Sequence, residues 1–373
     1  MPATTAMRLA EVAAWKKIVA EYQKPHSLRA SWQILNTIGA YAVLWYLMYL
    51  SLSVSWWITI PLAFLAGGLL VRVFIIFHDC GHGSFFKSPL ANGFWGFLAG
   101  VLTFTPYYHW RWEHSLHHAT AGKLNQRGVG DVWTLTVQEY LESSRWKRFA
   151  YRLARNPVVL FVIAPLFLFA IMQRVPPSKA NRRQQNSVWW MDLAIIGMVV
   201  GLGGIFGIIP YLVIQGTAMA VASSTGVWLF YVQHQFKDAY WERGDWDFTA
   251  AALKGSSFYR LPRVLQWFSG NIGFHHIHHL SPRIPNYNLE RCHRSDPIFL
   301  EVKPMTLFSS LRLHALRLWD ERAKQLVGFR RLKELQKRDR EAQDEKSEVE
   351  QRGGAADGVV HSLKESEAGE EQQ

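Results

Sequence analysis

The sequence predicts an all-α integral membrane protein: four transmembrane helices, re-entrant or interfacial segments, and a cytoplasmic helical cap that holds a di-metal site. Three observations lead to this prediction. Two long stretches of the chain lack Asp, Glu, Lys and Arg. Eight histidines fall in three tight clusters, each of which follows an apolar, aromatic stretch. Basic residues gather at those ends of the apolar stretches that lie on the side of the histidines.

Four transmembrane helices are expected from the two uncharged stretches. Residues 30–71 contain no charged residue or histidine, and residues 193–236 are interrupted only by His234. At about 1.5 Å per helical residue, each stretch is long enough to cross a hydrocarbon core of about 30 Å twice. We place the helices, to within several residues, at 34–52, 55–77, 188–208 and 211–231. The glycines of residues 201–204 and Pro210 suit a tight reversal between the last two helices.

Two further apolar segments, residues 92–107 and 157–172, lie at the short end of the length range for a spanning helix. Basic residues flank each segment on both sides: Lys87 and Arg111, then Arg155 and Arg174. A segment that crossed alone would carry one basic flank to the wrong face of the membrane. We therefore expect both segments to be re-entrant or interfacial; the alternative is that they are buried helices of a soluble enzyme.

The basic residues also predict an orientation. They cluster before the first helix, after the second, and between Arg174 and Arg183. The positive-inside tendency then places the N-terminus, the C-terminus and all three histidine clusters in the cytoplasm. The first thirty residues mix charges and lack an apolar core segment, so the first span is expected to act as its own insertion signal.

Composition suggests four regions. These are a cytoplasmic N-terminal segment (1–30), the membrane domain with the histidine clusters (31–300), a basic cytoplasmic segment (301–340) with helical periodicity over 307–340, and an acidic tail (341–373) expected to be disordered. The two cysteines, Cys80 and Cys292, belong to no paired motif, which excludes a disulfide framework, a zinc finger and an iron–sulfur cluster. The net charge of +12 favours anionic lipid headgroups and acidic protein partners.

The three histidine clusters predict metal ligation. Residues three or four apart share one face of a helix, so each cluster can direct several imidazoles to one place. Neutral imidazole is the commonest protein metal ligand, and eight donors exceed the four that one tetrahedral ion accepts, so two metal ions are the economical interpretation. The alternative is that each cluster is a polar helix end that meets water. The clusters comprise His78 and His82, then His114, His117 and His118, then His275, His278 and His279.

Other polar residues are candidates for supporting roles. His234, isolated at the end of the fourth span, is predicted as a ninth ligand, whereas His276 breaks the spacing of its cluster and His109 is left unassigned. Metal-bound imidazoles usually donate their second N–H to a carboxylate or carbonyl. Asn271 could offer an amide to a metal-bound water or cap a helix. The carboxylate candidates are Asp79, Glu113, Asp131, Asp238, Asp245 and Asp247.

An all-nitrogen ligand set suits iron, copper, nickel or zinc, so the ligands alone do not identify the metal. Hydrolysis needs only one or two metal ions and a carboxylate near the attacking water. An eight- or nine-histidine pair is better matched to redox chemistry with dioxygen. Because apolar segments adjoin the clusters, we expect a lipid chain as substrate.

These residues resemble the histidine boxes of the membrane fatty acid desaturases. The boxes are HDCGHG at residues 78–83, HSLHH at 114–118 and GFHHIHH at 273–279, with FYVQHQF at 230–236 between the last two. The resemblance extends over about residues 31–296. The forms of the first box and of the FYVQHQF stretch look most like bacterial and cyanobacterial acyl-lipid desaturases of the delta-12/omega-6 type.

The resemblance implies a mechanism and a location. It implies a di-iron centre (Fe2+/Fe3+) held by His78, His82, His114, His117, His118, His234, His275, His278 and His279, and removal of two vicinal hydrogens by O2 to leave a cis double bond in a membrane lipid acyl chain. It also implies a bacterial inner (cell) membrane. Animal acyl-CoA desaturases carry an asparagine four residues before the histidine that matches His234, and here that position is Phe230.

The two electrons needed per turnover must come from another protein. The chain has no cytochrome b5 haem motif, cysteine cluster or dinucleotide fingerprint. In the family the donor is a ferredoxin or a cytochrome b5-type protein acting in trans, and a basic cytoplasmic face suits either acidic partner. No nucleic-acid partner is expected.

Two alternative functions remain open at this stage. A hydroxylase or ketolase of the same superfamily, acting on a carotenoid, sphingolipid or alkane, would keep the site and change the product. A membrane metal transporter or sensor would use the histidines to pass or detect ions. Transporters usually place their ligands near the bilayer midplane, whereas these histidines lie at helix ends on one side.

Overall fold

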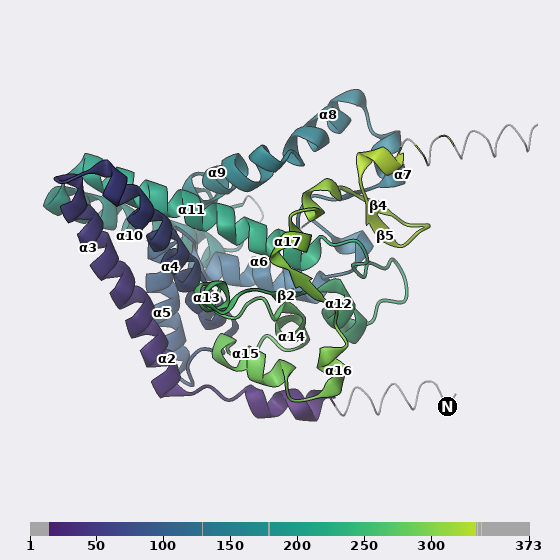
Figure 1. The fold of residues 1–373 in the computed structure, drawn as a ribbon, viewed down its shortest axis with the longest axis horizontal. Coiled ribbons are helices and arrows are strands. Elements are labelled where there is room, and N and C mark those ends of the chain that lie inside the picture. Colours follow the sequence, from purple (N-terminus) through teal and green to yellow (C-terminus); the bar gives the residue numbers. More distant parts are fainter. Residues whose placement is uncertain (1–14, 129, 178–179, 333, 335–336, 338–373) are drawn as a thin grey trace, which may run out of the picture. The chain divides into compact units, whose positions relative to one another are not determined.

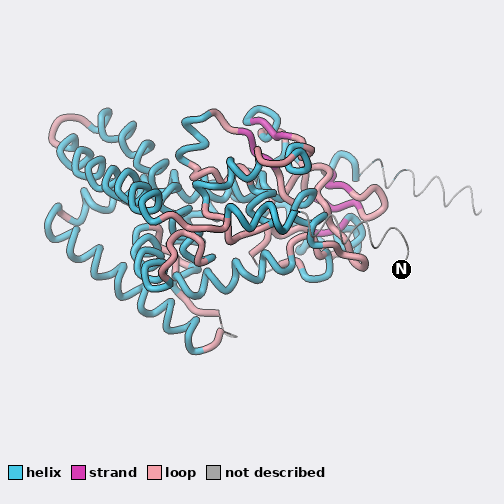
Figure 2. Tube along the Cα trace, turned by 90° about the horizontal axis from the view of Figure 1, so that it is seen from below, coloured by secondary structure: helices cyan, strands magenta, loops and turns pink. Residues whose placement is uncertain are grey.

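The fold is almost entirely helical, with a few short strands (Figures 1 and 2). The computed structural model describes residues 15–128, 130–177, 180–332, 334 and 337. The chain divides into two compact units, Met1–Leu326 and Val327–Gln373. The first contains all the elements discussed below as far as residue 326. In the described part of the second, residues 329–332 are helical. The predicted acidic tail lies outside the described residues.

Four stretches of helix are long and apolar enough to cross a membrane, which confirms the predicted number of spans. The first, Ser27–Leu52, consists of α2 (Ser27–Ile34), a π-helical turn η1 (Leu35–Gly39) and α3 (Ala40–Leu52). The others are α4 (Trp56–His82), α10 (Arg182–Phe206) and α11 (Ile208–His234). The Ser55 side chain caps the N-terminus of α4, and Gly83, at φ 69°, ends it in the left-handed conformation that glycine adopts without steric cost.

The reversal between α10 and α11 is shorter than expected. Helix α10 continues through the glycines of residues 201–204 to Phe206, and Pro210 lies in the first turn of α11. Only Gly207, at φ 91°, separates the two helices. In lipid no water is available to the backbone, so a segment must form its hydrogen bonds within the protein, as a helix does. This requirement outweighs the low helix propensity of glycine, and α10 therefore continues through residues 201–204.

Helix α4 is the centre of the membrane part, because it packs against α3, α5 (Pro89–Leu102) and α11. Its contact with α11 is especially close: a Cβ at Gly67 would lie 2.5 Å from Val221 Cβ. Arg72 links α4 to two neighbouring elements, since its Nε donates to Thr37 Oγ1 at 3.1 Å and its guanidinium lies 4.2 Å from the ring centre of Trp267. These contacts fix the direction in which the end of α4 approaches the cap.

The two shorter apolar segments do not form simple spans. Helix α5 is 14 residues long. The second segment follows α8 (Arg145–Ala154) and consists of η3 (Val159–Ile163), α9 (Ala164–Ala170) and η4 (Met172–Arg174). The axis bends by 61° between Arg145–Ala154 and Val159–Arg174. Both findings are compatible with re-entrant or interfacial segments.

The remaining elements form the cap. Two pairs of short parallel strands join segments that are distant in sequence: Leu135 pairs with Leu318, and Phe258 with Pro304. The cap elements are α6 (Tyr107–Thr120), η2 (Leu124–Gln126), β1 (Leu135–Thr136), α7 (Val137–Glu142), α12 (Phe248–Gly255), β2 (Phe258–Arg260), α13 (Arg263–Phe268), α14 (His275–Leu280), α15 (Asn286–His293), α16 (Pro297–Leu300), β3 (Pro304–Thr306), α17 (Leu307–Ser310), η5 (Leu313–Ala315), β4 (Leu318–Asp320) and β5 (Gln325–Val327).

One prediction about the cap is wrong. The helical periodicity over residues 307–340 suits a surface helix, but residues 307–327 form short helical turns and two strands, and only residues 329–332 of the continuously described part that follows are helical. The periodic apolar residues of this segment serve other purposes: Leu318, Trp319 and Leu326 are buried, and β4 extends the sheet begun by β1. Tertiary pairing therefore overrides the local helical pattern.

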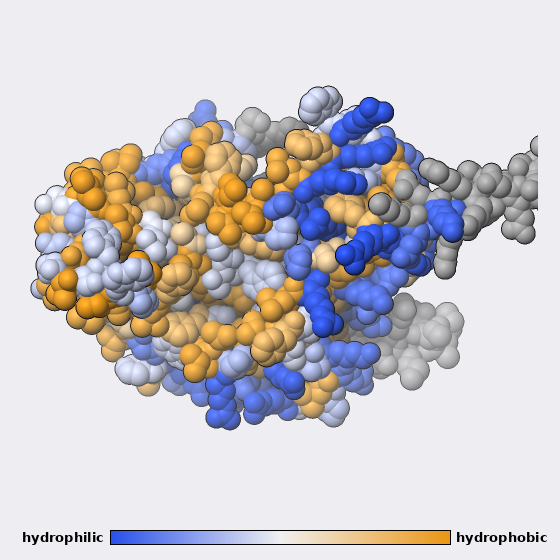
Figure 3. Space-filling model, turned by 45° about the horizontal axis from the view of Figure 1, so that its top comes forward, coloured by the Kyte–Doolittle hydropathy of each residue, from blue (hydrophilic) through white to orange (hydrophobic). Residues whose placement is uncertain are grey.

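The surface agrees with a membrane protein. In Figure 3, hydrophobic residues cover the left end, where α3 is followed by α4 and α10 by α11. Hydrophilic side chains gather towards the opposite end. Exposed apolar side chains on the spans include Val43, Phe64, Leu193 and Leu212. Such a surface is unfavourable in water and favourable in lipid.

Candidate metal centre

Four helices bring the predicted histidines together. His78 and His82 lie one turn apart at the end of α4, and His114, His117 and His118 lie on the last two turns of α6. The short helix α14 begins at His275, and His234 is the last residue of α11. Because all four helix ends meet at one level, residues far apart in sequence become neighbours.

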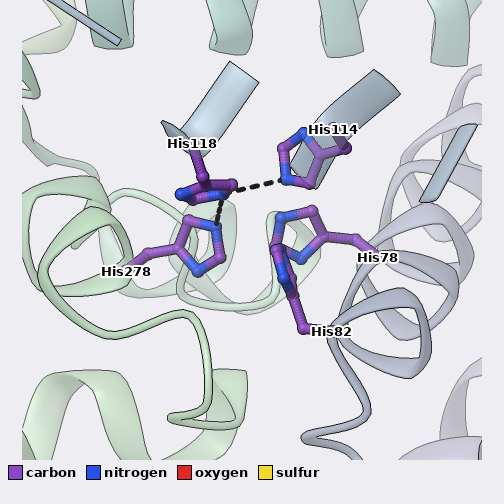
Figure 4. A group of neighbouring side chains, drawn as sticks. All are labelled: His78, His82, His114, His118 and His278. Carbon is purple, nitrogen blue, oxygen red and sulfur yellow. Dashed lines mark hydrogen bonds between the residues drawn. The ribbon is translucent and has the colours of Figure 1, made fainter. Parts of the chain in front are cut away.

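One group of histidines consists of five rings: His78, His82, His114, His118 and His278. Each offers a nitrogen, and these atoms all lie within 4.8 Å of one another. Figure 4 shows the five rings turned towards a common centre from three separate elements. His118 Nε2 lies 3.1 Å from His114 Nε2 and 3.0 Å from His278 Nε2.

A second group lies beside the first. His117, His234 and His279 also offer nitrogens within 4.8 Å of one another. His275 joins this group, because its Nε2 lies 2.9 Å from His234 Nε2, which in turn lies 3.2 Å from His117 Nε2. The two groups adjoin: the rings of His118 and His279 stack with centres 4.2 Å apart. The structure thus brings together all nine histidines predicted from the sequence, as five and four.

The arrangement of the ring nitrogens suits metal ligation better than hydrogen bonding between the rings. A neutral imidazole nitrogen carries either one hydrogen or one lone pair, so it can complete only one hydrogen bond of this kind. His118 Nε2 and His234 Nε2 each face two other ring nitrogens. In addition, His82 Nε2 and His279 Nε2 are buried with no hydrogen-bond partner among the described residues. A cation at the focus of each group would satisfy these nitrogens together.

The rings have the protonation state that metal binding requires. Burial, followed by the closeness of the other imidazoles, holds the pKa of His114, His118, His278 and His279 well below the ordinary histidine range. These rings are therefore neutral near pH 7 and each keeps a lone pair.

Two carboxylates orient one ligand in each group. Asp131 Oδ1 lies 2.8 Å from His117 Nδ1, and Asp79 Oδ1 lies 3.0 Å from His78 Nδ1. Each contact leaves Nε2 of its histidine free to point inward. Asp79 is held in turn, because its Oδ2 accepts from the backbone N of Asn286 at 2.6 Å and from its Nδ2 at 2.9 Å.

The other acidic candidates have different contacts. Glu113 Oε1 lies 3.5 Å from Nε2 of His109, a histidine of neither group. Asp247 caps α12 by accepting from Ala250 N at 2.7 Å. Asp238 is exposed. Two of the six candidate acids, Asp79 and Asp131, thus contact histidines of the two groups, and residue type alone does not distinguish them from the other four.

Two further expectations are resolved by contacts. His276 faces away from both groups, and its Nε2 lies 3.1 Å from His293 Nδ1 inside the cap. Asn271 has φ 60° and donates from Nδ2 to Asn286 O at 3.2 Å, so its amide supports the loop that holds Asp79.

Aromatic side chains cover the centre. Trp110 stacks on His114 with ring centres 4.4 Å apart and also contacts Phe77. Phe230 lies 5.3 Å from His117 and 5.1 Å from His234, ring centre to ring centre, where an asparagine would offer an amide. Trp110 is a residue of the site that the histidine spacing does not predict; its position one helical turn before His114 is the signal that the sequence offers.

The fold and the site define a class of protein: a membrane-spanning helical bundle whose capped end brings together nine histidines in two groups that could hold metal ions. Comparison with known proteins agrees. Residues 54–307 match the model of the fatty acid desaturase family. The chain is 47% identical, over 320 residues, to a fatty acid desaturase of Bacillus subtilis, with 86% of this chain and 91% of that protein covered.

More distant relatives have more specific names. An sn-1 oleoyl-lipid 12-desaturase of Synechocystis sp. is 27% identical over 277 residues, 70% of this chain and 74% of its own length. A chloroplastic omega-6 fatty acid desaturase of Arabidopsis thaliana is 27% identical over 275 residues, 72% of this chain and 59% of its own length. The chain therefore belongs to the fatty acid desaturase family, and it is a membrane oxidoreductase.

Proposed function

We propose that this protein is an O2-dependent desaturase that introduces a cis double bond into a lipid-linked fatty acyl chain, at the delta-12/omega-6 position. The observation that carries the proposal is the convergence of nine histidines into two adjoining groups at the capped end of an apolar bundle. The 12-desaturase and omega-6 desaturase names among the relatives support the position of the double bond.

The proposed ligands form two sets. His78, His82, His114, His118 and His278 would hold one iron ion, and His117, His234, His275 and His279 would hold the other. When bound, the iron pair supplies the redox chemistry that activates O2. In the balanced reaction, two adjacent methylenes lose two hydrogens, and O2, two electrons and two protons complete the formation of two waters.

The protein's own residues prepare this chemistry. The Asp79 and Asp131 carboxylates accept from Nδ1 of His78 and His117, which fixes the ring tautomers and directs both Nε2 atoms inward. Trp110 and Phe230 exclude water from the edges of the two groups and offer apolar surface to a chain of methylenes. Phe230 offers no amide at the position where the animal acyl-CoA desaturases carry an asparagine.

The proposal includes a location and an electron supply. Basic residues at the histidine end of the spans favour a cytoplasmic site, with both termini on that side of a bacterial inner membrane. The electrons come from a ferredoxin or cytochrome b5-type protein, since the sequence carries no redox cofactor motif of its own.

The proposal is tested by lipid analysis. The full chain is expressed with a ferredoxin and its reductase in a host that lacks polyunsaturated acyl chains. Mass spectrometry should show new diunsaturated chains, two hydrogens lighter than their monounsaturated precursors. His117→Ala should abolish them, because it removes a proposed ligand and leaves Asp131 without its partner. His109→Gln, a change of a nearby histidine outside both groups, should retain most of the activity.

Other products would contradict the proposal. Chains heavier by one oxygen would indicate a hydroxylase or ketolase, and an unchanged lipid profile with normal expression would exclude desaturation of these lipids. Equal activity of His117→Ala and the wild type would show that the nine-histidine centre does not carry the reaction.

A further inference from the structure

An open cleft of about 460 Å³ reaches the edge of the five-histidine group. Three separate segments line it: the N-terminal stretch at Gln23 and Pro25, the end of α4 and its following loop from His82 to Lys87, and the loop after α14 at Arg283. None of these residues belongs to the four-histidine group. The cleft thus opens at the surface beside the five-histidine group and does not reach the four-histidine group.

Hydrogen bonds hold the three walls of the cleft together. Gln23 Nε2 donates to Ser281 Oγ at 2.8 Å, which joins the N-terminal wall to the loop of Arg283. The Tyr287 hydroxyl on α15 accepts from His26 N at 2.9 Å and donates to Phe85 O at 3.1 Å, which joins the N-terminal wall to the loop after α4. The cleft is therefore built into the fold and does not depend on the arrangement of a single loop.

The cleft is cationic. Lys87 and Arg283 line it and are exposed, and Lys24 lies exposed between two lining residues. Among the described residues that line the cleft none is acidic, and within the described chain neither Lys87 nor Arg283 forms an ion pair. Unpaired cations around a cleft attract an acidic partner and are screened by salt.

The floor of the cleft lies next to the proposed redox centre. His82 lines the cleft, and its ring centre lies 4.9 Å from those of His114 and His118 and 5.0 Å from that of His278. A protein that docked here would contact His82, a member of the five-histidine group, and only this imidazole would separate it from the focus of the group. Electron transfer between proteins requires such a close approach of the two redox groups.

We infer that this cleft docks the acidic one-electron donor protein and that electrons enter the metal centre past the edge of His82. This inference rests on the proposed function, which requires an external donor. Two donor molecules, each oxidised by one electron, supply the two electrons of a turnover. With two protons from water, and the two hydrogens removed from the acyl chain, these electrons convert O2 into two waters.

The cleft does not fit the acyl substrate. An acyl chain needs a continuous apolar lining, and Pro25 and Phe86 are the cleft's apolar side chains beside polar and charged residues. The phosphate of a lipid headgroup would also favour Lys87 and Arg283, however. The experiment must therefore distinguish an acidic protein from a headgroup.

The test measures donor binding independently of turnover. The full-length protein, loaded with iron, is placed in nanodiscs of zwitterionic lipid, and binding of two probes is measured: a plant-type [2Fe–2S] ferredoxin and the soluble domain of a cytochrome b5. We expect salt-sensitive binding of at least one probe, weakened about tenfold or more by Lys87→Glu with Arg283→Glu. Lys147→Glu on α8 is the matched control, an exposed lysine elsewhere, and should change binding less than about twofold.

A second measurement maps the contact. A zero-length carbodiimide joins lysines to carboxylates in ion pairs, so it should link Lys87 to an acidic residue of the bound probe, and mass spectrometry should identify the joined peptides. Iron content and apparent Tm show whether the double variant is folded. Because both substituted side chains are exposed, we expect both values to match those of the wild type.

The outcomes separate this inference from the proposed function. Unaffected binding in the double variant, equal loss in Lys147→Glu, or no binding of either probe to the wild type would overturn the docking site. A raised KM for the lipid with normal donor binding would assign the cleft to a headgroup and also overturn it. Failure of the proposed function would appear differently, as absent diunsaturated lipid in a wild type that still binds its donor.

Discussion

At the residue scale, the direction of an imidazole is set by its second nitrogen. His78 and His117 have carboxylates at Nδ1, whereas His118, His275 and His278 have Nδ1 atoms that are buried without a partner among the described residues. The orientation of these three rings therefore depends on packing and on what their Nε2 atoms bind. In each group, therefore, one ring is held in its orientation by a carboxylate.

Asp131 provides a test at this scale. We expect Asp131→Asn to lower the iron affinity about 10-fold to 100-fold, because a neutral amide holds the His117 Nδ1 hydrogen less strongly than a carboxylate does. Iron bound per chain is measured against a graded concentration of a competing chelator. Asp238→Asn, which changes an exposed acid in the same way, should leave the affinity unchanged. Equal affinities for the two variants would contradict the role given to Asp131.

At the scale of elements, the ends of α4 and α11 must lie side by side for His78 and His82 to meet the other clusters. Glycine allows this approach. A Cβ at Gly67 would lie 2.5 Å from Val221 Cβ and 3.1 Å from the backbone oxygen of Ala218, so neither helix could keep its position. Small residues at such crossings are typical of membrane helices, because they let the backbones approach closely.

We expect Gly67→Ala to destabilise the protein by about 1–3 kcal/mol, since the added methyl group forces α4 and α11 apart. The apparent Tm in a fixed detergent should fall by a few degrees. Gly216→Ala on α11 is the control, because nothing lies within 4 Å of its added Cβ, and alanine favours helix more than glycine does. Its Tm should be equal or higher. A Gly67→Ala protein as stable as Gly216→Ala would show that the crossing is looser than described.

At the scale of the whole molecule, the centre connects membrane spans to cap. The ligands proposed for iron come from α4, α6, α11 and α14, which are separated by long stretches of sequence. Metal ions that bind only the folded arrangement stabilise it by mass action. The centre is thus proposed to be a structural link as well as a reactive site.

Removal of iron should therefore lower stability throughout the protein. At a free iron concentration 100 times the dissociation constant, the expected stabilisation is about 2.7 kcal/mol for each independent site. We expect the apparent Tm to fall after dialysis against a chelator and to recover on anaerobic addition of Fe2+. In His117→Ala the recovery should be smaller. A Tm that does not depend on iron in the wild type would contradict the structural role.

Much of the fold was predictable because it depends on local properties of the chain. Absence of charge over residues 30–71 and 193–236 identified four spans, and three-to-four residue spacing identified the histidine clusters. Segment 307–327 was mispredicted, because its apolar residues pack in strands against β1 rather than on a helix face. Helix α10 begins at Arg182, six residues before the expected start, because its polar first turns lie outside the apolar stretch from which the helix is predicted.

The sequence by itself determined that helices with histidines at one end cross a membrane, since hydropathy and helical spacing are properties of consecutive residues. Only the tertiary structure decided that His118 faces His278 while its neighbour His117 faces His234, and that Asp79 and Asp131 orient the rings. It also brought Lys87 and Arg283 to one cleft beside His82. These pairings join segments far apart in the chain, and they depend on how closely α4, α6, α11 and α14 pack, which no local pattern encodes.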